Sequence, residues 1–427
     1  MRNPARGEMM ASTPGQRWPR FRWFIVAMLA AAAVLNYLDR QTLALMAGAI
    51  QGQLRISDVG YATLVNAFLV AYTIGGLISA LIVDRLGARR SMMLFVGWWS
   101  LASALSGMAG SLWQLAATRF ALGIAEAGGW IASPKLVQEW FPSRERALAI
   151  GIYSSAAHFG AALAPILVTT LLLSVGWRAT FIVTGTIGLT WLAVWLLIYR
   201  PNIIAPVDSE MVPERGTGRG PAEWVAVLRT RAVWLIAIGN ALTNPVWFFY
   251  LFWFPKYLTE ERGLTVAEMG RLSWVVYASA GIGSVLGGVV SGALVRRGMR
   301  PARARVATMA LVAVIAPIGA FNALAPAVWI SLALGALVAL VHTAWVTNQT
   351  ALCVDLYPGR HIGKVMAVNG IIGGLVTIVT TQLVGELVAT ITYRPMFLVI
   401  AIAYPLGLLA AFLATTGRSM LDREVAA

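Results

Sequence analysis

Long runs of apolar residues are the feature that most constrains the fold of this chain of 427 residues. A helix of about 20 apolar residues spans the hydrocarbon core of a bilayer, and only helices and closed barrels can cross that core. Barrel strands would alternate apolar and polar residues over segments of about 10 residues, and these runs do not alternate. The sequence therefore predicts an all-α membrane protein with twelve transmembrane helices. We place the spans at residues 23–46, 60–83, 91–111, 113–133, 147–173, 177–199, 232–256, 269–294, 306–324, 326–353, 362–390 and 395–415.

The composition excludes several classes of protein. Hydrophobic residues make up 59% of the chain and charged residues 12%, whereas soluble globular proteins average roughly 45–50% and about 25%. A soluble enzyme, a disordered protein and a disulfide-rich secreted module are therefore excluded. The single cysteine, Cys353, can form no intrachain disulfide, and we interpret it as inert packing.

The basic residues predict how the chain is oriented in the membrane, because lysine and arginine concentrate in cytoplasmic loops. If the N-terminus is inside, the cytoplasmic segments hold 25 of the 33 basic residues and the outer loops hold six. We therefore expect both termini to be cytoplasmic, and we interpret the net charge of +15 as a topology signal rather than a sign of nucleic-acid binding.

The spans divide into two equal groups. The longest polar interval, 200–231, follows six spans and precedes six, and its prolines and glycines are typical of a linker. Residues 75–85 (GGLISALIVDR) and 287–297 (GGVVSGALVRR) align without a gap at the ends of spans 2 and 8. Such repeats mark transporters in which one half rocks against the other. We predict a cytoplasmic tail at 1–22, six-helix halves at 23–199 and 232–415, a cytoplasmic linker at 200–231 and a second tail at 416–427.

The loop between spans 2 and 3 resembles the signature loop of the major facilitator superfamily. Residues 84–90 read DRLGARR, and residues 119–123 in span 4 (RFALG) resemble the superfamily's second motif. Ala80 departs from the glycine that usually lies four residues before the aspartate, and the second copy has Arg296 in place of the acid. The resemblance covers essentially the whole chain and implies the superfamily's fold of two pseudo-symmetric six-helix halves. The residues that it assigns to gating are Asp84, Arg85 and Arg89.

Charged residues inside a span are functional candidates, because a charge at the bilayer centre costs at least about 2.5–3.5 kcal/mol. In span 1, Asn36, Tyr37 and Arg40 share one face of a helix, and Asp39 points about 100° away from Arg40. A guanidinium flanked by an amide and a phenol is suited to a carboxylate, because arginine can bind it through two hydrogen bonds. The alternative is an Asp–Arg pair that only holds helices together, since removing one partner of a buried pair is costly.

Glu126 is a second acid, placed in span 4 among the small residues of 123–129 (GIAEAGG), which allow close helix packing. Burial favours the neutral form of a carboxyl group, and a nearby arginine favours the charged form. Glu126 could therefore change its protonation when a substrate occupies the arginine, which is the physical basis of coupling between protons and an anion. The alternative is a permanent salt bridge of Glu126 to Arg40 or Arg119.

The pattern Asn-Tyr-x-Asp-Arg at 36–40, together with the acid in span 4, resembles the anion:cation symporters, a family that includes galactonate, hexuronate and vesicular glutamate transporters. The resemblance implies that Asp39 and Glu126 are the proton-coupling groups and that Arg40 binds the substrate carboxylate. Residues 244–258 in span 7 look most like the hexuronate branch of the family.

Further residues are predicted to contact the substrate. Tyr37 and Tyr72 match the tyrosines of the family's substrate site. Amides could also bind one helix to another, aromatic rings could lie in membrane-interface belts, and His158 could be an interhelical donor or a proton relay. For His342 we favour a role in helix packing over a role in the substrate site. The remaining predicted substrate contacts are Asn36, His158, Asn244, Trp247, Tyr250, Asn348, Gln349 and Asn369.

We interpret the chain as a secondary transporter that imports an organic anion, a sugar acid such as a hexuronate or an aldonate, by proton-coupled symport. No phosphate loop of the form GxxxxGK[ST] is present, so ATP does not drive transport, and no enzyme motif is present. We expect no catalytic residue, cofactor or metal. The expected partners are the anion, protons and the lipid bilayer, and we expect a monomer in the inner membrane of a bacterium.

Two other functions stay open. The first is an antiporter that exports a metabolite or drug, although such proteins typically carry a Gly-Pro pair in span 5 and residues 160–165 (GAALAP) lack it. The second is a membrane sensor that transports nothing. The sequence also leaves open whether protons or sodium ions are coupled, and which of Asp39 and Glu126 dominates the coupling.

Overall fold

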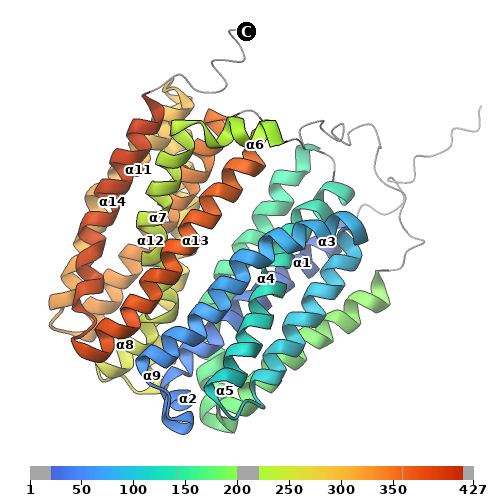
Figure 1. Ribbon diagram of the computed structural model, residues 1–427, viewed down its shortest axis with the longest axis vertical. Helices are drawn as coiled ribbons and strands as arrows, with labels where there is room; N and C mark the ends of the chain where they lie inside the picture. Colours follow the sequence, from blue (N-terminus) through green and yellow to red (C-terminus); the bar gives the residue numbers. More distant parts are fainter. Residues whose placement is uncertain (1–20, 142, 200–220, 358, 417–427) are drawn as a thin grey trace, which may run out of the picture.

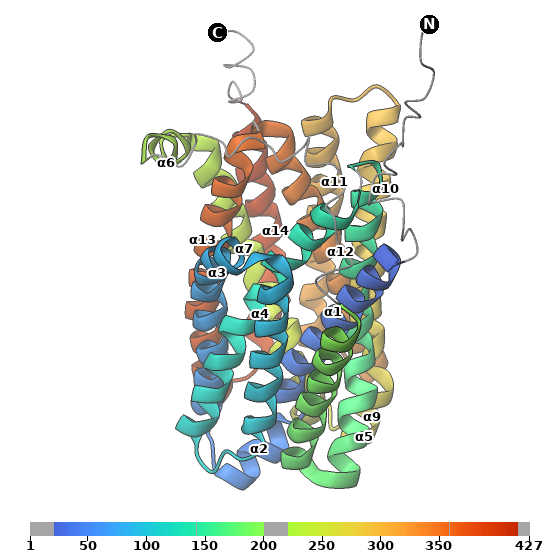
Figure 2. The same ribbon diagram turned by 90° about the vertical axis from the view of Figure 1, so that its right-hand side faces the viewer.

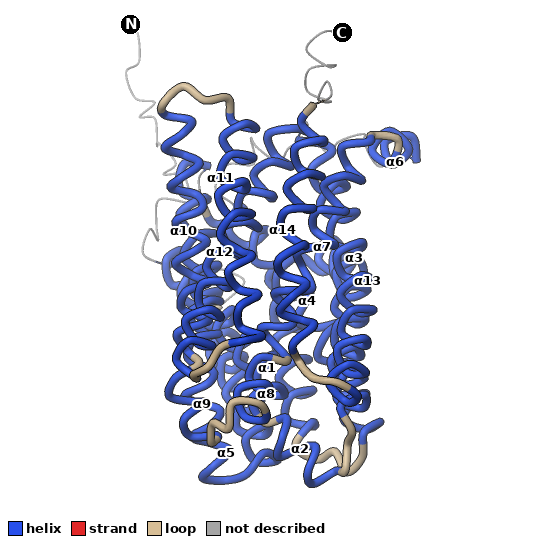
Figure 3. Tube along the Cα trace, turned by 90° about the vertical axis from the view of Figure 1, so that its left-hand side faces the viewer, coloured by secondary structure: helices blue, strands red, loops and turns tan. Residues whose placement is uncertain are grey.

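The computed structural model describes residues 21–141, 143–199, 221–357 and 359–416. Every regular element in these ranges is a helix (Figure 3). The first part of the chain forms α1 (Phe21–Leu45), α2 (Ala47–Leu54), α3 (Asp58–Ser106), α4 (Leu112–Trp140) and α5 (Ser143–Ile198). The second part forms α6 (Pro221–Leu228), α7 (Arg231–Phe252), α8 (Phe254–Glu260), α9 (Val266–Leu272), α10 (Trp274–Arg296), α11 (Pro301–Ile315), the 3₁₀ helix η4 (Ala316–Leu324), α12 (Val328–Leu356), α13 (Gly359–Thr390) and α14 (Arg394–Thr415). Residues 1–20 and 417–427 of the predicted tails, and 200–220 of the predicted linker, lie outside the described residues.

Among the described residues, nine helices are long and apolar enough to cross a membrane. Two of them contain a sharp bend at a glycine with a positive φ, Gly87 in α3 (77°) and Gly176 in α5 (80°), a backbone conformation that glycine adopts without steric cost. Each bend falls between two spans that the sequence predicts as separate. The all-helical membrane fold is thus confirmed, and the number of twelve spans stays a prediction.

The structure adds local detail to three of the predicted segments. The span predicted to end at residue 133 continues as α4 through Pro134 to Trp140, because a helix can keep a proline at the loss of one backbone hydrogen bond. The span predicted at 306–324 tightens into η4 at its end, where Pro317 cannot donate to the preceding turn. The linker predicted at 200–231 contains the short helix α6.

The helices form two bundles that lie side by side (Figure 1). In one bundle α3 packs against α4 and α5, and α1 packs against α5; in the other, α7 packs against α13 and α14, and α10 packs against α12. Figure 1 shows the bundles close together at the end labelled α2, α8 and α9, and farther apart at the end that carries α6. Figures 1 and 2 show α6 lying crosswise to the long helices. We call these two ends the α2 end and the α6 end.

Polar contacts join the two bundles at the α2 end. Lys256 of α8, whose side chain is 2% exposed, contacts the Asp58 carboxylate of α3 at 2.7 Å and the Glu260 carboxylate of its own helix at 2.5 Å. Tyr393 donates its hydroxyl to Glu260 at 2.8 Å. Burial and this carboxylate raise the pKa of the Tyr393 phenol, so it stays protonated and can donate. Tyr61 of α3 donates to the Phe252 carbonyl of α7 at 2.7 Å.

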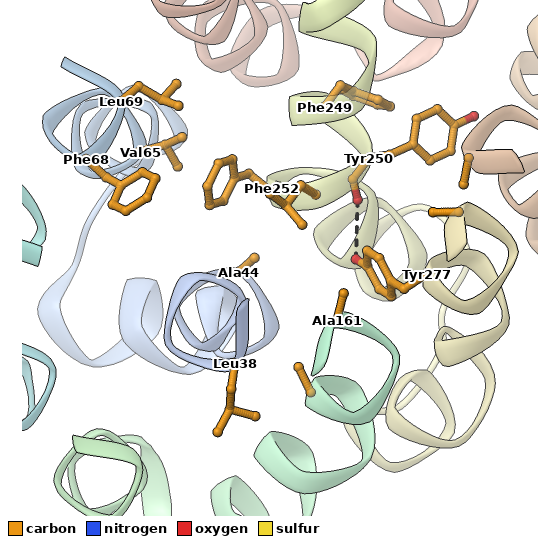
Figure 4. Packing of buried hydrophobic residues seen from close by; sticks show 14 of the residues in the cluster. Leu38, Ala44, Val65, Phe68, Leu69, Ala161, Phe249, Tyr250, Phe252 and Tyr277 are labelled. Carbon is orange, nitrogen blue, oxygen red and sulfur yellow. Dashed lines mark hydrogen bonds between the residues drawn. The ribbon is translucent and has the colours of Figure 1, made fainter. Parts of the chain in front are cut away.

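Apolar packing continues this junction toward the middle of the molecule. Phe68 of α3 faces Phe252 of α7 across the two bundles, with ring centroids 6.1 Å apart (Figure 4). Tyr277 donates to the Tyr250 carbonyl at 3.3 Å, which fixes α10 to α7 inside the second bundle. On the outer surface large apolar side chains are exposed, such as Val314 at 76% and Leu197 at 72%, as expected of helices that face lipid.

Candidate functional site

Arg40 lies at the centre of the site, on α1 inside the first bundle. Its Nε and Nη2 atoms donate to Oε2 of Glu126 on α4 at 3.0 and 2.9 Å. The residue is 6% exposed and Glu126 is fully buried. A charge pair of this kind holds two helices together, and losing either partner would leave an uncompensated charge in a nonpolar environment. Of the two arginines foreseen as partners of Glu126, the structure therefore selects Arg40.

The face of α1 predicted from helical spacing is present. Nη2 of Arg40 donates to Oδ1 of Asn36, one turn earlier, at 3.2 Å. The Arg40 guanidinium carbon lies 4.9 Å from the ring centre of Tyr37 and 4.7 Å from that of Tyr72. Phe68, which the sequence did not single out, adds a third ring at 5.2 Å. We call Tyr37, Tyr72 and Phe68 together the Arg40 cage. Aromatic faces stabilise a guanidinium while leaving its N–H groups available.

Asp39 points away from this cage, as the helical spacing predicts. Its Oδ1 accepts a hydrogen bond from Ser103 of α3 at 2.7 Å, and Ser103 lies 3.3 Å from the hydroxyl of Thr184. Arg119, also buried, donates to Ser106 at 2.6 Å. Oδ2 of Asp39 and Oε1 of Glu126 are buried without a hydrogen-bond partner among the described residues. Both acids therefore keep one oxygen that could hold a proton.

A cavity of about 680 Å³ lies between the bundles beside the Arg40 cage. Tyr72 belongs to both, since its ring contacts Arg40 and lines the cavity. The volume is within the range of about 300–1,000 Å³ found for small-molecule sites. The α3 part of the lining runs from Leu69 to Ala80, away from the α2 end at which α3 begins. The described residues that line the cavity are Leu69, Tyr72, Thr73, Gly76, Leu77, Ala80, Ile131, Asn240, Asn244, Phe248, Gly363, Met366, Ala367, Gly370, Ile371, Gly374 and Thr377.

The predicted amides of the second bundle divide into two groups. Asn244 lines the cavity and donates to the Thr377 hydroxyl at 3.0 Å. Asn369 lies next to the cavity residue Gly370, and its Oδ1 is buried without a partner among the described residues. Asn348 and Gln349 instead donate to backbone carbonyls of α10 and α7, both at 3.0 Å, inside the bundle. The structure does not bring these two amides to the cavity.

Two aromatic candidates also differ in their surroundings. The Trp247 ring is half-buried and stacks on His342, with centroids 5.6 Å apart and planes within 4°. His342 in turn lies 2.9 Å from the Tyr404 hydroxyl, in keeping with the structural role favoured for it. Tyr250 is 1% exposed and packs on Phe254, so it lies in the core of the second bundle (Figure 4).

His158 of α5 lies between the bundles. It lines a second hollow of about 480 Å³ together with Gly281 and Ser284 of α10. Its ring centroid is 6.5 Å from that of Tyr37, which places it next to the Arg40 cage. The structure therefore brings His158 to the junction of the two bundles, where a role in binding and a role in packing both stay predictions.

The predicted gating loop lies at the bend of α3 around Gly87. Asp84 contacts Lys135 of α4 at 3.3 Å, with both side chains partly exposed. Arg89 donates to the Tyr199 carbonyl at the end of α5, and its guanidinium carbon lies 4.7 Å from the Tyr199 ring. Arg85 is exposed. These contacts lie within the first bundle.

Sequence reasoning missed two polar cavity residues of the second bundle, Asn240 and Thr377. Asn240 lies one turn before Asn244 on α7, so helical spacing alone places both amides on one face. Thr377 gave no such signal, because buried threonines commonly bond to their own helix.

Comparisons with known proteins show what the chain as a whole is similar to. The sequence profile of the Major Facilitator Superfamily matches residues 29–381. The hexuronate transporter of Escherichia coli (strain K12) is 28% identical over 403 residues, which cover 91% of this chain and 92% of that protein. The probable galactarate/D-glucarate transporter of Bacillus subtilis (strain 168) is 30% identical and covers 67% of this chain and 68% of its own length. A crystal structure of a bacterial homolog of the human lysosomal transporter Spinster, inward-facing and occupied, superposes with a TM-score of 0.75 at 20% identity over 96% of this chain and 98% of its own.

Proposed function

The chain belongs to the major facilitator superfamily of membrane transporters, and from this premise we propose that it carries a sugar acid across the membrane together with a proton. It is a transporter and not an enzyme. The proposed substrates are hexuronates and aldonates, the anions named for several of its relatives. The proposed coupling ion is the proton, carried by Glu126 and Asp39.

The Arg40–Glu126 pair is the observation that carries this proposal. Arg40 binds a carboxylate through two of its nitrogens at 3.0 and 2.9 Å, and that carboxylate belongs to Glu126. A substrate carboxylate offers the same kind of charged acceptor oxygen and would reach Arg40 past Tyr72, whose ring forms part of the cavity wall. Substrate and Glu126 therefore compete for one guanidinium.

The competition supplies the coupling. When the substrate takes Arg40, Glu126 loses its counter-charge inside a fully buried site. An isolated buried charge is so unfavourable that the carboxylate takes up a proton instead. Binding of the anion and of the proton then favour each other, and the loaded carrier moves both. Asp39, held by Ser103, is the proposed second proton site.

The proposed transport cycle alternates between closure at the α2 end and closure at the α6 end. The contacts of Lys256 with Asp58 and of Tyr61 with Phe252 support the first state. We propose that the α6 end is cytoplasmic, in agreement with the basic loops, and that Asp84, Arg85 and Arg89 act when that end closes. The protein is proposed to work as a monomer in a bacterial inner membrane, with import as the direction in the cell.

Uptake into proteoliposomes tests the proposal. Labelled D-glucuronate and D-galactonate are offered with and without an imposed pH gradient, and a sodium gradient serves as the alternative driving force. We expect accumulation above the external concentration only with the pH gradient, and its loss on adding a protonophore. Accumulation driven by sodium alone, or no entry of either anion, would contradict the proposal.

A further inference from the structure

Asn240 and Asn244 of α7 form a pair of amides on the cavity wall contributed by the second bundle. They lie four residues apart and therefore on one face of the helix. Each is fastened to α13: Nδ2 of Asn240 donates to the Asn369 carbonyl at 2.9 Å, and Nδ2 of Asn244 donates to the Thr377 hydroxyl at 3.0 Å.

These partners fix which end of each amide faces α13. The Asn369 carbonyl can only accept, so the NH₂ group of Asn240 must face it. The Thr377 hydroxyl uses its proton on the Gly373 carbonyl at 2.8 Å, so it accepts from Asn244. The Oδ1 atoms of Asn240 and Asn244 receive no hydrogen bond from the part of the chain that the structure describes, and each is left as an acceptor.

The close packing of α13 makes this orientation specific. A Cβ atom at Gly373 would lie 2.2 Å from Nδ2 of Asn240, so the amide would have to move from its position. Gly373 therefore has a packing role, because its missing side chain leaves the space that the Asn240 amide occupies.

The lining of the cavity is neutral, and the charged groups lie behind it. None of the described residues that line it is charged. The Arg40 guanidinium lies behind Tyr72 in the first bundle, and Glu126 already shares it. The cavity thus offers one site for a carboxylate on one side and neutral acceptor oxygens on the other.

We propose that the Oδ1 atoms of Asn240 and Asn244 accept hydrogen bonds from substrate hydroxyls and thereby select a sugar acid with one carboxylate over one with two. The inference rests on the proposed function and narrows its substrate class. A hydroxyl donates to these oxygens, whereas a second carboxylate has no proton to donate to them and meets no charged side chain in the described lining of the cavity. Its charge would stay unpaired in the cavity.

Equilibrium binding to the purified protein tests this selection, with D-glucuronate as the monoacid, D-glucarate as the diacid and D-glucose as the neutral sugar. We expect D-glucuronate to bind at least about tenfold more tightly than D-glucarate, because an unpaired charge opposes binding. D-glucose should bind more weakly than D-glucuronate, because it has no carboxylate for Arg40.

Two substitutions at Asn244 test whether this residue contributes to the selection. Asn244→Lys adds a cation to the cavity wall and should strengthen the binding of D-glucarate, whereas Asn244→Met, of similar length and without charge, removes the acceptor oxygen and should weaken the binding of D-glucuronate without strengthening that of D-glucarate. Equal binding of D-glucuronate and D-glucarate by the unmodified protein would overturn the inference and leave the proposed function intact. Binding of neither acid would overturn both, and the comparison within the unmodified protein holds whether or not the variants fold.

Discussion

The Arg40 guanidinium binds Glu126 through two nitrogens, and this geometry makes its replacement by lysine a sharp test at the level of one residue. Arg40→Lys keeps the charge but cannot reproduce the planar pair of donors. We expect the affinity for D-glucuronate to fall at least about tenfold, since a hydrogen bond to a charged group contributes about 1.5–3 kcal/mol. Equilibrium binding measures the loss.

Arg305→Lys is the matched control for that experiment. Arg305 contacts Asp355 at 3.2 Å within the second bundle, away from the cavity, so its replacement should leave the affinity unchanged. If Arg40→Lys binds D-glucuronate as tightly as the unmodified protein does, Arg40 is not the carboxylate ligand.

Glu126→Gln separates proton coupling from substrate binding. Glutamine keeps the shape of a protonated glutamate but cannot release a proton, so the carrier cannot return empty after discharging one. We expect exchange of internal for external D-glucuronate to persist and accumulation driven by a pH gradient to be lost. Counterflow and gradient-driven uptake in the same proteoliposomes measure the two activities.

Asp39→Asn and the double variant complete this test, because two interacting acids titrate as a pair. Uphill uptake that survives in both single variants and in the double variant would contradict proton coupling through these acids. Loss of exchange together with binding in Glu126→Gln would instead indicate that the Arg40 pair has only a structural role.

The sequence predicted which side chains share a face, but not which ones meet across helices. The spacing of Asn36 and Arg40 on α1 is fixed by the helical repeat, and the 3.2 Å hydrogen bond between them follows from it. Glu126 lies 86 positions from Arg40 in the sequence. Their pairing depends on the relative axial position at which α4 packs against α1, and no local sequence pattern determines that position. The same reason left Phe68 unrecognised as the third ring of the cage.

At the level of helices, the junction of α8 with α3 controls closure of the α2 end. The Lys256 side chain is 2% exposed and bridges Asp58 of the other bundle and Glu260 of its own helix. Lys256→Met should destabilise this closure, because it removes the cation that Asp58 of one bundle and Glu260 of the other share. The measurement uses a cysteine at the buried position Ala62, in a background with Cys353→Ala. We expect this cysteine to react with a water-soluble maleimide at least about tenfold faster in Lys256→Met than in the protein with Lys256.

Arg305→Met provides the comparison for this labelling experiment. It removes an ion pair that lies wholly within the second bundle, and it should leave the reactivity at position 62 unchanged. An equal labelling rate in Lys256→Met and the unmodified protein would show that the Asp58 pair does not hold the two bundles together.

The sequence predicted the existence of the helices better than their ends. Apolar runs of sufficient length identify a membrane helix regardless of what it packs against. The continuation of α4 through Pro134 and the tightening of the chain into η4 depend on whether neighbouring helices satisfy the freed backbone groups, which is a tertiary property. The helix α6 was missed because eight residues among prolines and glycines carry little periodicity.

At the level of the whole molecule, the repeat at 75–85 and 287–297 predicts two related halves, and the two bundles of Figure 1 agree with it. The cavity could not be predicted in the same way, because its walls come from α3, α4, α7 and α13 of both bundles. With Arg40 in the first bundle and the neutral amides of Asn240 and Asn244 in the second, a bound sugar acid would lie with its carboxylate toward the first bundle and its hydroxyls toward the second.

Proton movement that accompanies substrate entry distinguishes coupled transport from entry of the anion alone. Proteoliposomes containing a pH-sensitive dye are given D-glucuronate on the outside, with no imposed ion gradient and with potassium and valinomycin present to prevent charge from building up. We expect the lumen to acidify with D-glucuronate and not with D-glucose, and we expect Glu126→Gln to abolish the acidification while exchange of labelled D-glucuronate continues. Entry of labelled D-glucuronate without any acidification would contradict it.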